Sequence, residues 1–221
     1  WTLAVDLLSP VDNDRVRMVN DVAGVDTVVP TVKGEVQLFN EDSRVGCRLV
    51  GLPHDSPVNR LNLIAGRSYR DNEVMEIVLD KEDAKALGAQ VGDSIRVVSG
   101  RQEAEAVLVG LVTGLISGQA YGGLEMSRRL LEMKDRANGL FLTLAPGAGE
   151  KETVDRLYAL DFVGRVTSKA GVVNDFMALT SEIMGIVYLC SAFAILTGVL
   201  FIFTGITLNI LEREAEYATL Q

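Results

Sequence analysis

The C-terminal part of the chain is a long apolar stretch that runs into a charged segment. No side chain between Glu182 and Glu212 carries a formal charge, and a membrane-spanning helix needs about 20 apolar residues. The pattern therefore predicts a transmembrane helix over residues 183–211. Because neither proline nor glycine interrupts the flanking segments, we expect one continuous helix from near Val172 to Gln221, about 75 Å long at ~1.5 Å per residue.

The beginning of the chain shows shorter patterns of both helical and strand type. Ser9 as N-cap, Pro10 at the first helical position and Gly24 as the stop predict a short helix. The following residues, 25–40, are rich in β-branched side chains and predict either two strands or one bent strand, with the break near Pro30 and Gly34.

The middle of the chain contains the most regular local pattern. A strand ends at Leu79, Asp80 caps a short helix that stops at Gly88, and a second strand follows over Ser94–Val98. Strands and helices mixed in this order predict an α+β domain followed by a long stalk and transmembrane α-helix. The remaining expected elements are strands near 104–112, 139–146 and 164–169 and helices near 122–133 and 151–160.

Charge separates the two parts of the chain and excludes one class of partner. The chain is 48% hydrophobic with a formal charge of −9, and residues 1–182 carry 27 acidic and 20 basic side chains, a formal charge of −7. An acidic balance argues against nucleic acid as a partner and offers no polybasic patch for anionic lipid. The chain begins with Trp1 and shows no signal peptide, so we expect a fragment. If residues 1–182 lie outside the cytoplasm, an upstream segment, such as another membrane helix, must export them.

Candidate catalytic and metal-binding residues are few. Cys47 and Cys190 lie in different parts of the chain and predict no disulfide, and His54 is the single histidine. The sequence "GAGEKET" lacks the spacing of a phosphate-binding loop and is interpreted as a polar turn that opens a helix. These patterns predict a non-catalytic protein with no metal site and no cofactor of its own.

The apolar stretch carries a stripe of small residues. Ser191, Ala194, Gly198 and Gly205 recur at spacings of three, four and seven, so they share one side of a helix. Small residues in a line let a second helix approach closely, which predicts helix packing inside the membrane. The alternative is a lipid-facing helix in which the glycines have no packing role.

The segment "LEREAEYATLQ" after the apolar stretch resembles the EREYATL-type segment of FtsX-like permeases, the MacB-type or type VII ABC transporters. The segment "LDKEDAKALGAQVGDSIRV" also resembles part of the extracytoplasmic domain of that family. The resemblance implies a porter-like α/β lobe (residues 1–46 and 112–170) with an inserted small β-rich lobe (47–111). It further implies a stalk helix (171–182), a transmembrane helix (183–211) and the start of a cytoplasmic coupling segment (212–221).

What the resemblance implies for function is mechanical coupling to an ATPase. The chain would be part of a permease subunit in the plasma membrane, with residues 1–182 outside the cytoplasm and the C-terminal end inside it. ATP would bind to a partner ATPase, and the substrate would be a lipoprotein, peptide, lipid or drug. The residues expected to contact the ATPase are Glu212, Arg213, Glu214, Glu216 and Tyr217.

Further partners implied by the resemblance are a second permease chain, as homodimer or paired permease, the lipid bilayer and an extracytoplasmic protein. Two alternatives remain open at this point. One is an extracytoplasmic sensor that signals through a single membrane helix, and the other is a regulator of cell-wall enzymes. Likeness of fold cannot select a cargo.

Overall fold

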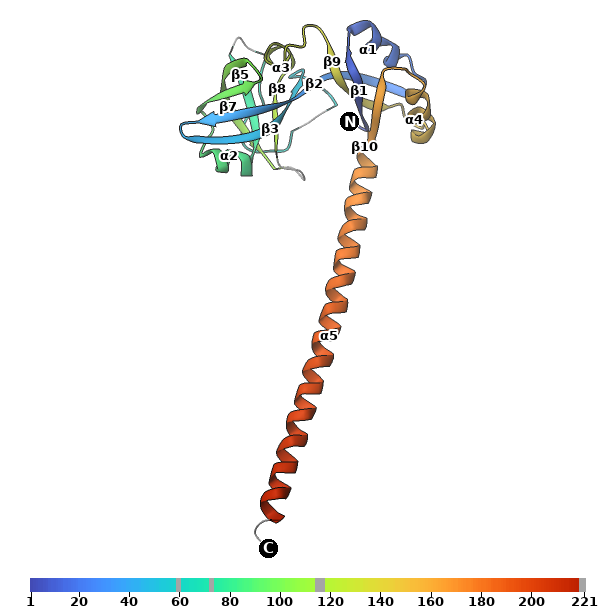
Figure 1. The fold of residues 1–221 in the computed structure, drawn as a ribbon. Coiled ribbons are helices and arrows are strands. Elements are labelled where there is room, and N and C mark those ends of the chain that lie inside the picture. The colour runs from blue at the N-terminus through green and yellow to red at the C-terminus, as the bar shows by residue number, and fades with distance from the viewer. Residues whose placement is uncertain (59–60, 72–73, 114–117, 219–221) are drawn as a thin grey trace. The chain divides into compact units, whose positions relative to one another are not determined.

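The computed structural model describes residues 1–58, 61–71, 74–113 and 118–218, with the backbone alone at residue 209 and from residue 211 on (Figure 1). The chain forms two compact units, Trp1–Lys169 and Ala170–Gln221. We call the first unit the head. Its elements, in chain order, are β1 (Leu3–Val11), α1 (Asn13–Asn20), β2 (Val25–Asn40), β3 (Ser43–Leu52), β4 (Leu63–Gly66), β5 (Met75–Asp80), α2 (Lys81–Leu87), β6 (Ser94–Ser99), β7 (Gln102–Val112), β8 (Gln119–Gly123), α3 (Leu124–Leu130), β9 (Ala137–Leu144), α4 (Glu150–Tyr158) and β10 (Val163–Ser168).

The strands of the head join into one ten-stranded sheet that is mostly antiparallel. The order is β10-β1-β9-β2-β3-β8-β5-β7-β4, and β6 pairs with both β2 and β7. Only β3 with β8 and β5 with β7 are parallel pairs. Strands and helices are mixed along the chain, so the expected α+β class is confirmed.

The strand β2 connects the two halves of this sheet. Its first part, Val25–Thr31, pairs with β9, and its second part, from Val32 on, pairs with β3. It is one continuous strand of 16 residues, so of the two sequence expectations the single strand is correct. Figure 1 shows α1 and α4 beside the strands β1 and β10, and α2 and α3 beside the other group of strands.

Buried side chains form a separate core on each half of the sheet. One core gathers residues of β1, β9, α1 and α4, including Leu3, Leu140 and Leu157, all 0% exposed. Another gathers residues of β2, β3, β5 to β8, α2 and α3. A third, which includes Val29 and Phe141, joins β2 and β9 to β3, β5 and β7. The cores hold the head together across long sequence separations.

Segments on both sides of the predicted inserted lobe contribute side chains to the core of that lobe. Val36, Ala120 and Leu130 pack in the same core as Cys47 and Ile77, although they lie outside the range 47–111 that we assigned to the inserted lobe. The second half of β2, β8 and α3 thus share a core with that range. The proposed lobe limits themselves stay a prediction.

Both α1 and α2 are capped by an aspartate, but the sequence analysis located only the ends of α2 correctly; α1 ends at Asn20, before the predicted stop at Gly24. As expected, Asp80 caps α2 by accepting from the Glu82 N–H (3.0 Å), and Gly88 ends it at φ +67°. The predicted start of the first helix at Ser9 was wrong, because Ser9 and Pro10 belong to β1 and Asp12 is the N-cap. Ser9 and Pro10 continue the extended chain of β1, which pairs with β9 on both sides of them, at Leu3–Asp6 and at Val11, so the helix begins only after Val11.

The second unit is a single helix. The helix α5 (Lys169–Ala218) has 50 residues, about 75 Å at ~1.5 Å per residue, without a break. Its stretch Lys169–Leu208 is long and apolar enough to cross a membrane. The expected continuous helix is confirmed from Lys169 to Ala218, and residues 219–221 lie outside the described part of the chain.

Candidate functional site

The start of α5 is attached directly to the sheet of the head. Ser168 is the last residue of β10 and Lys169 is the first of α5, so no loop separates strand from helix. Within the head, Ser168 lies opposite Leu3 of β1, and the Lys169 N–H donates to the Thr2 carbonyl (3.0 Å). The residue that begins the helix is therefore held by the antiparallel pair β1 and β10.

The apolar part of α5 presents its side chains outward on every side. The large apolar side chains from Phe176 to Ile210 are all exposed, Phe201 most of all at 78%. Thr180, Thr197, Thr204 and Thr207 each donate their hydroxyl to the carbonyl four residues earlier, at 2.8–2.9 Å. Such internal bonds satisfy polar groups where water is absent, so the helix suits a lipid environment.

The small residues predicted to pack against another helix all lie on α5. Ser191, Ala194, Gly198 and Gly205 are exposed, and a Cβ added at either glycine would meet nothing within 4 Å. Their packing role stays a prediction.

The five residues predicted to contact the ATPase are part of the last turns of α5. The backbone is helical from Glu212 through Arg213, Glu214, Glu216 and Tyr217 to Ala218. Their side chains lie outside the described part of the chain. The structure thus places them on a direct helical continuation of the apolar stretch of α5, and their role stays a prediction.

The charged groups inside the head serve its structure. The carboxylate of Glu76, which is 8% exposed, accepts two hydrogen bonds from the Arg67 guanidinium (both 2.7 Å) and one from the Arg70 N–H (2.9 Å). A bidentate arginine and a backbone donor satisfy a buried carboxylate and fix the loop after β4.

Burial keeps two potentially reactive side chains of the head protonated. Burial raises the pKa of the Cys47 thiol to about 12, with a smaller contribution from the charges of Asp83 and Glu35. Burial likewise raises the pKa of Tyr69. Both groups stay protonated near neutral pH, and a thiol is a poor nucleophile in that form. Among the described residues no group of three His, Cys, Asp or Glu side chains could hold a metal ion.

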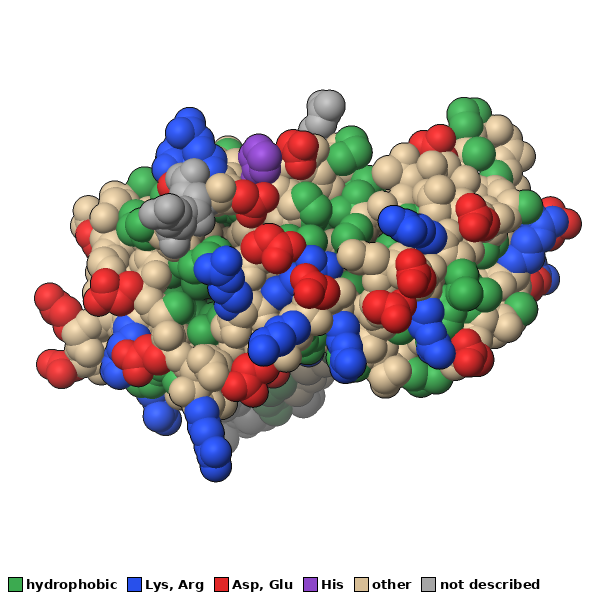
Figure 2. Space-filling view, turned by 90° about the horizontal axis from the view of Figure 1, so that it is seen from above, with side chains coloured by type: hydrophobic (Ala, Val, Ile, Leu, Met, Phe, Trp, Pro, Cys, Tyr) green, Lys and Arg blue, Asp and Glu red, His purple; other side chains and the backbone are tan. Residues whose placement is uncertain are grey.

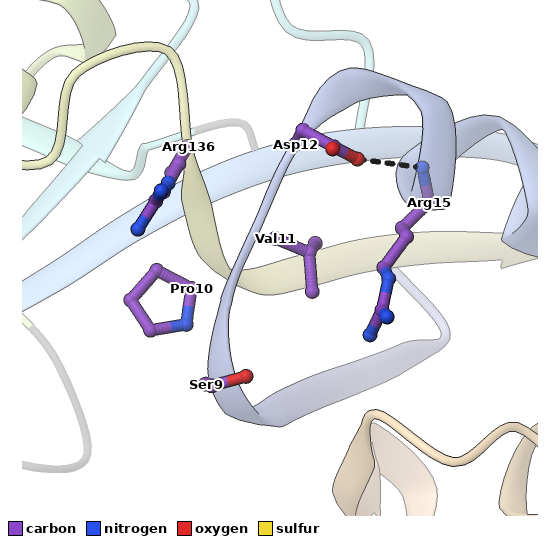
Figure 3. A pocket seen from close by; sticks show the side chains of 6 residues that line it. All are labelled: Ser9, Pro10, Val11, Asp12, Arg15 and Arg136. Carbon is purple, nitrogen blue, oxygen red and sulfur yellow. Dashed lines mark hydrogen bonds between the residues drawn. The ribbon is translucent and has the colours of Figure 1, made fainter.

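The surface of the head contains one cleft that the sequence analysis did not anticipate. We call it the arginine cleft; it has a volume of about 250 Å³ and is lined by Ser9, Pro10, Val11, Asp12, Arg15 and Arg136 (Figure 3). A second cleft, of about 440 Å³, is lined by residues of β2, β3 and the β6–β7 turn. Figure 2 shows acidic and basic side chains interspersed over one face of the head, without a large area of one sign.

The fold of the head is similar to that of solved extracytoplasmic domains of ABC-type transporters. The extracellular domain of the noncanonic ABC-type transporter YknZ from Gram-positive bacteria is similar, with a TM-score of 0.53 and 15% identity over 69% of this chain and 87% of that one. The periplasmic region of MacB from Actinobacillus actinomycetemcomitans has a TM-score of 0.55 and 14% identity, over 80% and 92% of the two chains. No family model and no curated protein matches the sequence.

These comparisons bear on the fold. The expected MacB-like α+β domain followed by a long apolar helix is confirmed, because both solved domains share the arrangement of the head. At about 15% identity the likeness is one of architecture, and side-chain roles cannot be carried over from it.

Proposed function

We propose that the chain is part of the permease subunit of an ABC transporter and that it transmits movement across the membrane. The observation that carries the proposal is α5. This uninterrupted helix starts at Lys169, directly after the last residue of β10, and continues through the apolar stretch into the charged segment. The likeness of the head to the YknZ and MacB domains supports it.

The physical reason is that a helix transmits displacement only while its hydrogen bonds are continuous. The chain from Lys169 to Ala218 contains no proline, so no backbone N–H is missing from the ladder. A movement imposed at the C-terminal end would reach β10 without being absorbed by a flexible linker. In the head, β10 pairs with β1, which in turn pairs with β9, so the displacement would act on the sheet.

Partners and location follow from this proposal. A separate or fused ATPase binds ATP and contacts Glu212, Arg213, Glu214, Glu216 and Tyr217 in the cytoplasm, and the head lies outside the plasma membrane. A second permease chain packs along the stripe of small residues on α5. The transported substrate is a lipoprotein, peptide, lipid or drug, handled at the extracytoplasmic face.

The first experiment tests the ATPase contact. The protein is purified from native membranes with its bound partners, and ATP hydrolysis is compared for the wild type, Tyr217→Asp and Tyr217→Phe. We expect an ABC-type ATPase to copurify, Tyr217→Asp to lose coupled hydrolysis, and Tyr217→Phe to retain it because the aromatic ring is kept. Unchanged hydrolysis in Tyr217→Asp would remove the residue from the contact.

The second experiment tests helix continuity in the stalk. Ala178→Pro removes one backbone hydrogen bond and kinks the helix, a cost of about 3 kcal/mol, whereas Ala178→Leu keeps a good helix former. We expect the proline variant to bind the ATPase normally and to lose transport, and the leucine variant to behave as wild type. Full transport by Ala178→Pro would contradict transmission through a rigid helix.

The sensor alternative makes the opposite prediction for copurification. A sensor with one membrane helix would copurify with a kinase or another output protein and not with an ATPase. A regulator of cell-wall enzymes would bring down a hydrolase through the head, and its binding would survive truncation after Leu211. Either result, without an ATPase, would replace the permease proposal.

A further inference from the structure

The arginine cleft arises from an irregularity in β1. This strand pairs with β9 from Leu3 to Asp6 and then again only at Val11, opposite Ala137. The residues between have no partner in β9, and the cleft lies beside them and Arg136, the residue just before β9. Interruptions of this kind bend a strand and occur often beside binding sites.

One side of the cleft is formed by the first turn of α1. Arg15 is exposed, and its guanidinium carbon lies 5.3 Å from the centre of the Phe162 ring. The contact is with an aromatic ring and not with an acceptor oxygen, and within the described part of the chain the Arg15 guanidinium donates to no protein oxygen. Arg15 forms no ion pair within the part of the chain that the structure describes.

The other side of the cleft is formed by the turn between α3 and β9. The buried Arg128 donates from Nε to the Arg136 carbonyl (3.1 Å) and from Nη1 to the Glu125 carboxylate (2.7 Å). These two hydrogen bonds connect the end of the turn to α3. Two non-glycine residues of the turn, Glu132 and Asp135, have φ values of +55° and +50°. These are uncommon for such residues and show that the turn is held in a defined conformation.

The Arg136 side chain extends into the cleft. Figure 3 shows Arg136 and Arg15 on either side of Pro10 and Val11. Among the described residues the Arg136 guanidinium has no ion-pair partner. Asp12 is the one acidic residue of the lining, and its carboxylate accepts from the Arg15 N–H (3.1 Å) as the cap of α1. The lining therefore carries two positive charges and one negative charge.

We propose that the arginine cleft binds a single oxyanion group, a phosphate or carboxylate, between the guanidinium groups of Arg15 and Arg136. Planar guanidinium groups bind both oxyanions through paired N–H donors. The volume of about 250 Å³ lies below the range of ~300–1,000 Å³ typical of drug-sized ligands, so the cleft suits a small group. The source is a free small molecule or a lipid headgroup. This site is independent of the role proposed for α5.

The test is an NMR titration of the chain in neutral detergent micelles at constant ionic strength. The probes are inorganic phosphate and acetate, and the observed signals are the arginine Nε–Hε groups. We expect the Arg15 and Arg136 signals to shift together and saturate with one dissociation constant. The signal of Arg17, which lies on the same helix and pairs with Asp14 (3.6 Å), serves as internal reference and should not saturate with them.

Matched variants make the result specific. In Arg136→Gln we expect the dissociation constant read at Arg15 to rise about tenfold or more, as for loss of one charged hydrogen-bond partner. Arg17→Gln should leave it unchanged, and the backbone spectrum reports whether each variant is folded. If Arg15 and Arg136 shift without saturation, or if Arg17→Gln weakens binding as much as Arg136→Gln, the proposal is overturned.

A separate arm distinguishes the two sources of the oxyanion. Micelles containing phosphatidylglycerol replace the neutral micelles, with no phosphate added. Shifts of Arg15 and Arg136 in this arm that inorganic phosphate then reverses would identify a lipid headgroup, whereas shifts with soluble anions alone would identify a free small molecule. No response of the two signals in any arm would overturn the site.

Discussion

The head and α5 are stabilised in opposite ways. In the head, strands distant in sequence pair with each other, and side chains such as Leu3, Ile77 and Leu140 are 0% exposed. In α5 the apolar side chains are exposed, and the backbone bonds join residues four apart. The head therefore depends on burial between distant segments, whereas α5 depends on local hydrogen bonds and on a surrounding that accepts apolar side chains.

This contrast matters for the proposed function. A sheet assembled from distant strands can respond as a unit when one of its strands is moved, and a helix built from local bonds can keep its length while it moves. The same substitution should thus have different consequences in the two regions, and matched pairs of variants measure the difference. All unfolding experiments below use the chain in detergent micelles.

The head and α5 should differ most in the loss of unfolding free energy when an isoleucine is replaced by alanine. Ile77→Ala in β5 removes a side chain that is 0% exposed and should lower the free energy of unfolding of the head by about 2–5 kcal/mol. Ile195→Ala in α5 removes a side chain that is 69% exposed and should change it by less than about 0.5 kcal/mol. Urea unfolding followed by near-ultraviolet circular dichroism measures both. Equal losses would contradict the assignment of Ile195 to an unpartnered helix.

Replacing an asparagine by alanine should give a smaller difference in stability between the head and α5. In the head, Asn138 accepts from the Lys33 N–H (2.8 Å) and donates to the Lys33 carbonyl (2.7 Å), next to the point where β2 passes from β9 to β3. Asn138→Ala leaves both backbone groups without this partner and should cost about 2 kcal/mol. Asn174→Ala, at an exposed position of α5, should not destabilise, because alanine favours helix.

The readout for the asparagine pair is again urea unfolding, with hydrogen exchange of the Lys33 amide as a second measurement. Faster exchange at Lys33 in Asn138→Ala, with little change in Asn174→Ala, would show that the bonds act at the junction of the two halves of the sheet. An Asn138→Ala variant as stable as the wild type would mean that water replaces the amide at no cost.

Replacing a glycine by alanine should destabilise the head but favour the helix of α5. Gly88 ends α2 at φ +67°, a conformation that costs an alanine about 1 kcal/mol even though a Cβ would meet nothing within 4 Å. Gly198 lies inside α5, where alanine is the better helix former by about 1 kcal/mol. We expect Gly88→Ala to destabilise the head and Gly198→Ala to preserve helicity while weakening any helix association along the stripe. Association is measured by crosslinking in native membranes.

The smallest expected effect is the pH dependence that Cys47 confers on the head. Burial raises the pKa of its thiol in the folded state to about 12, so folding favours the protonated form. This contribution is fully present below the pKa of the unfolded thiol and is lost as pH rises from there toward 12. Between pH 8 and pH 9.5 the loss should be about 1 kcal/mol.

The control for the pH experiment is Cys47→Ala. It should lower stability at both pH values and flatten the decline between them, while the far-ultraviolet signal of α5 stays constant in both proteins. An equally steep decline in Cys47→Ala would assign the pH dependence to other groups, such as the buried Tyr69, whose pKa is also raised by burial.

Local patterns in the sequence predicted the elements that are stabilised by contacts between residues close in sequence. Asp80 and Gly88 marked the ends of α2 correctly, and the uncharged stretch after Glu182 marked α5. Patterns failed where distant pairing decides. Ser9 and Pro10 have the chemistry of a helix start but lie in β1, and the short strand β8 was missed because its small residues "QAYGG" show no strand pattern.

The arginine cleft also could not be predicted from local sequence patterns. Arg15 and Arg136 are 121 positions apart, and nothing near either one in the sequence marks a binding site. They come to one cleft because β1 and β9 pair at Val11 and Ala137, which places the first turn of α1 beside the turn before β9. A site built from distant strand ends has no local signature.

By itself, the sequence determined that the chain ends in one long apolar helix, because helical hydrogen bonds join neighbours four residues apart and the lack of charge over a whole membrane thickness can be read directly. Only the tertiary structure decided that β2 serves both halves of the sheet and that β10 passes into α5 without a loop. Strand pairing depends on which distant segments bury their apolar faces together, and that choice is made by the whole head at once.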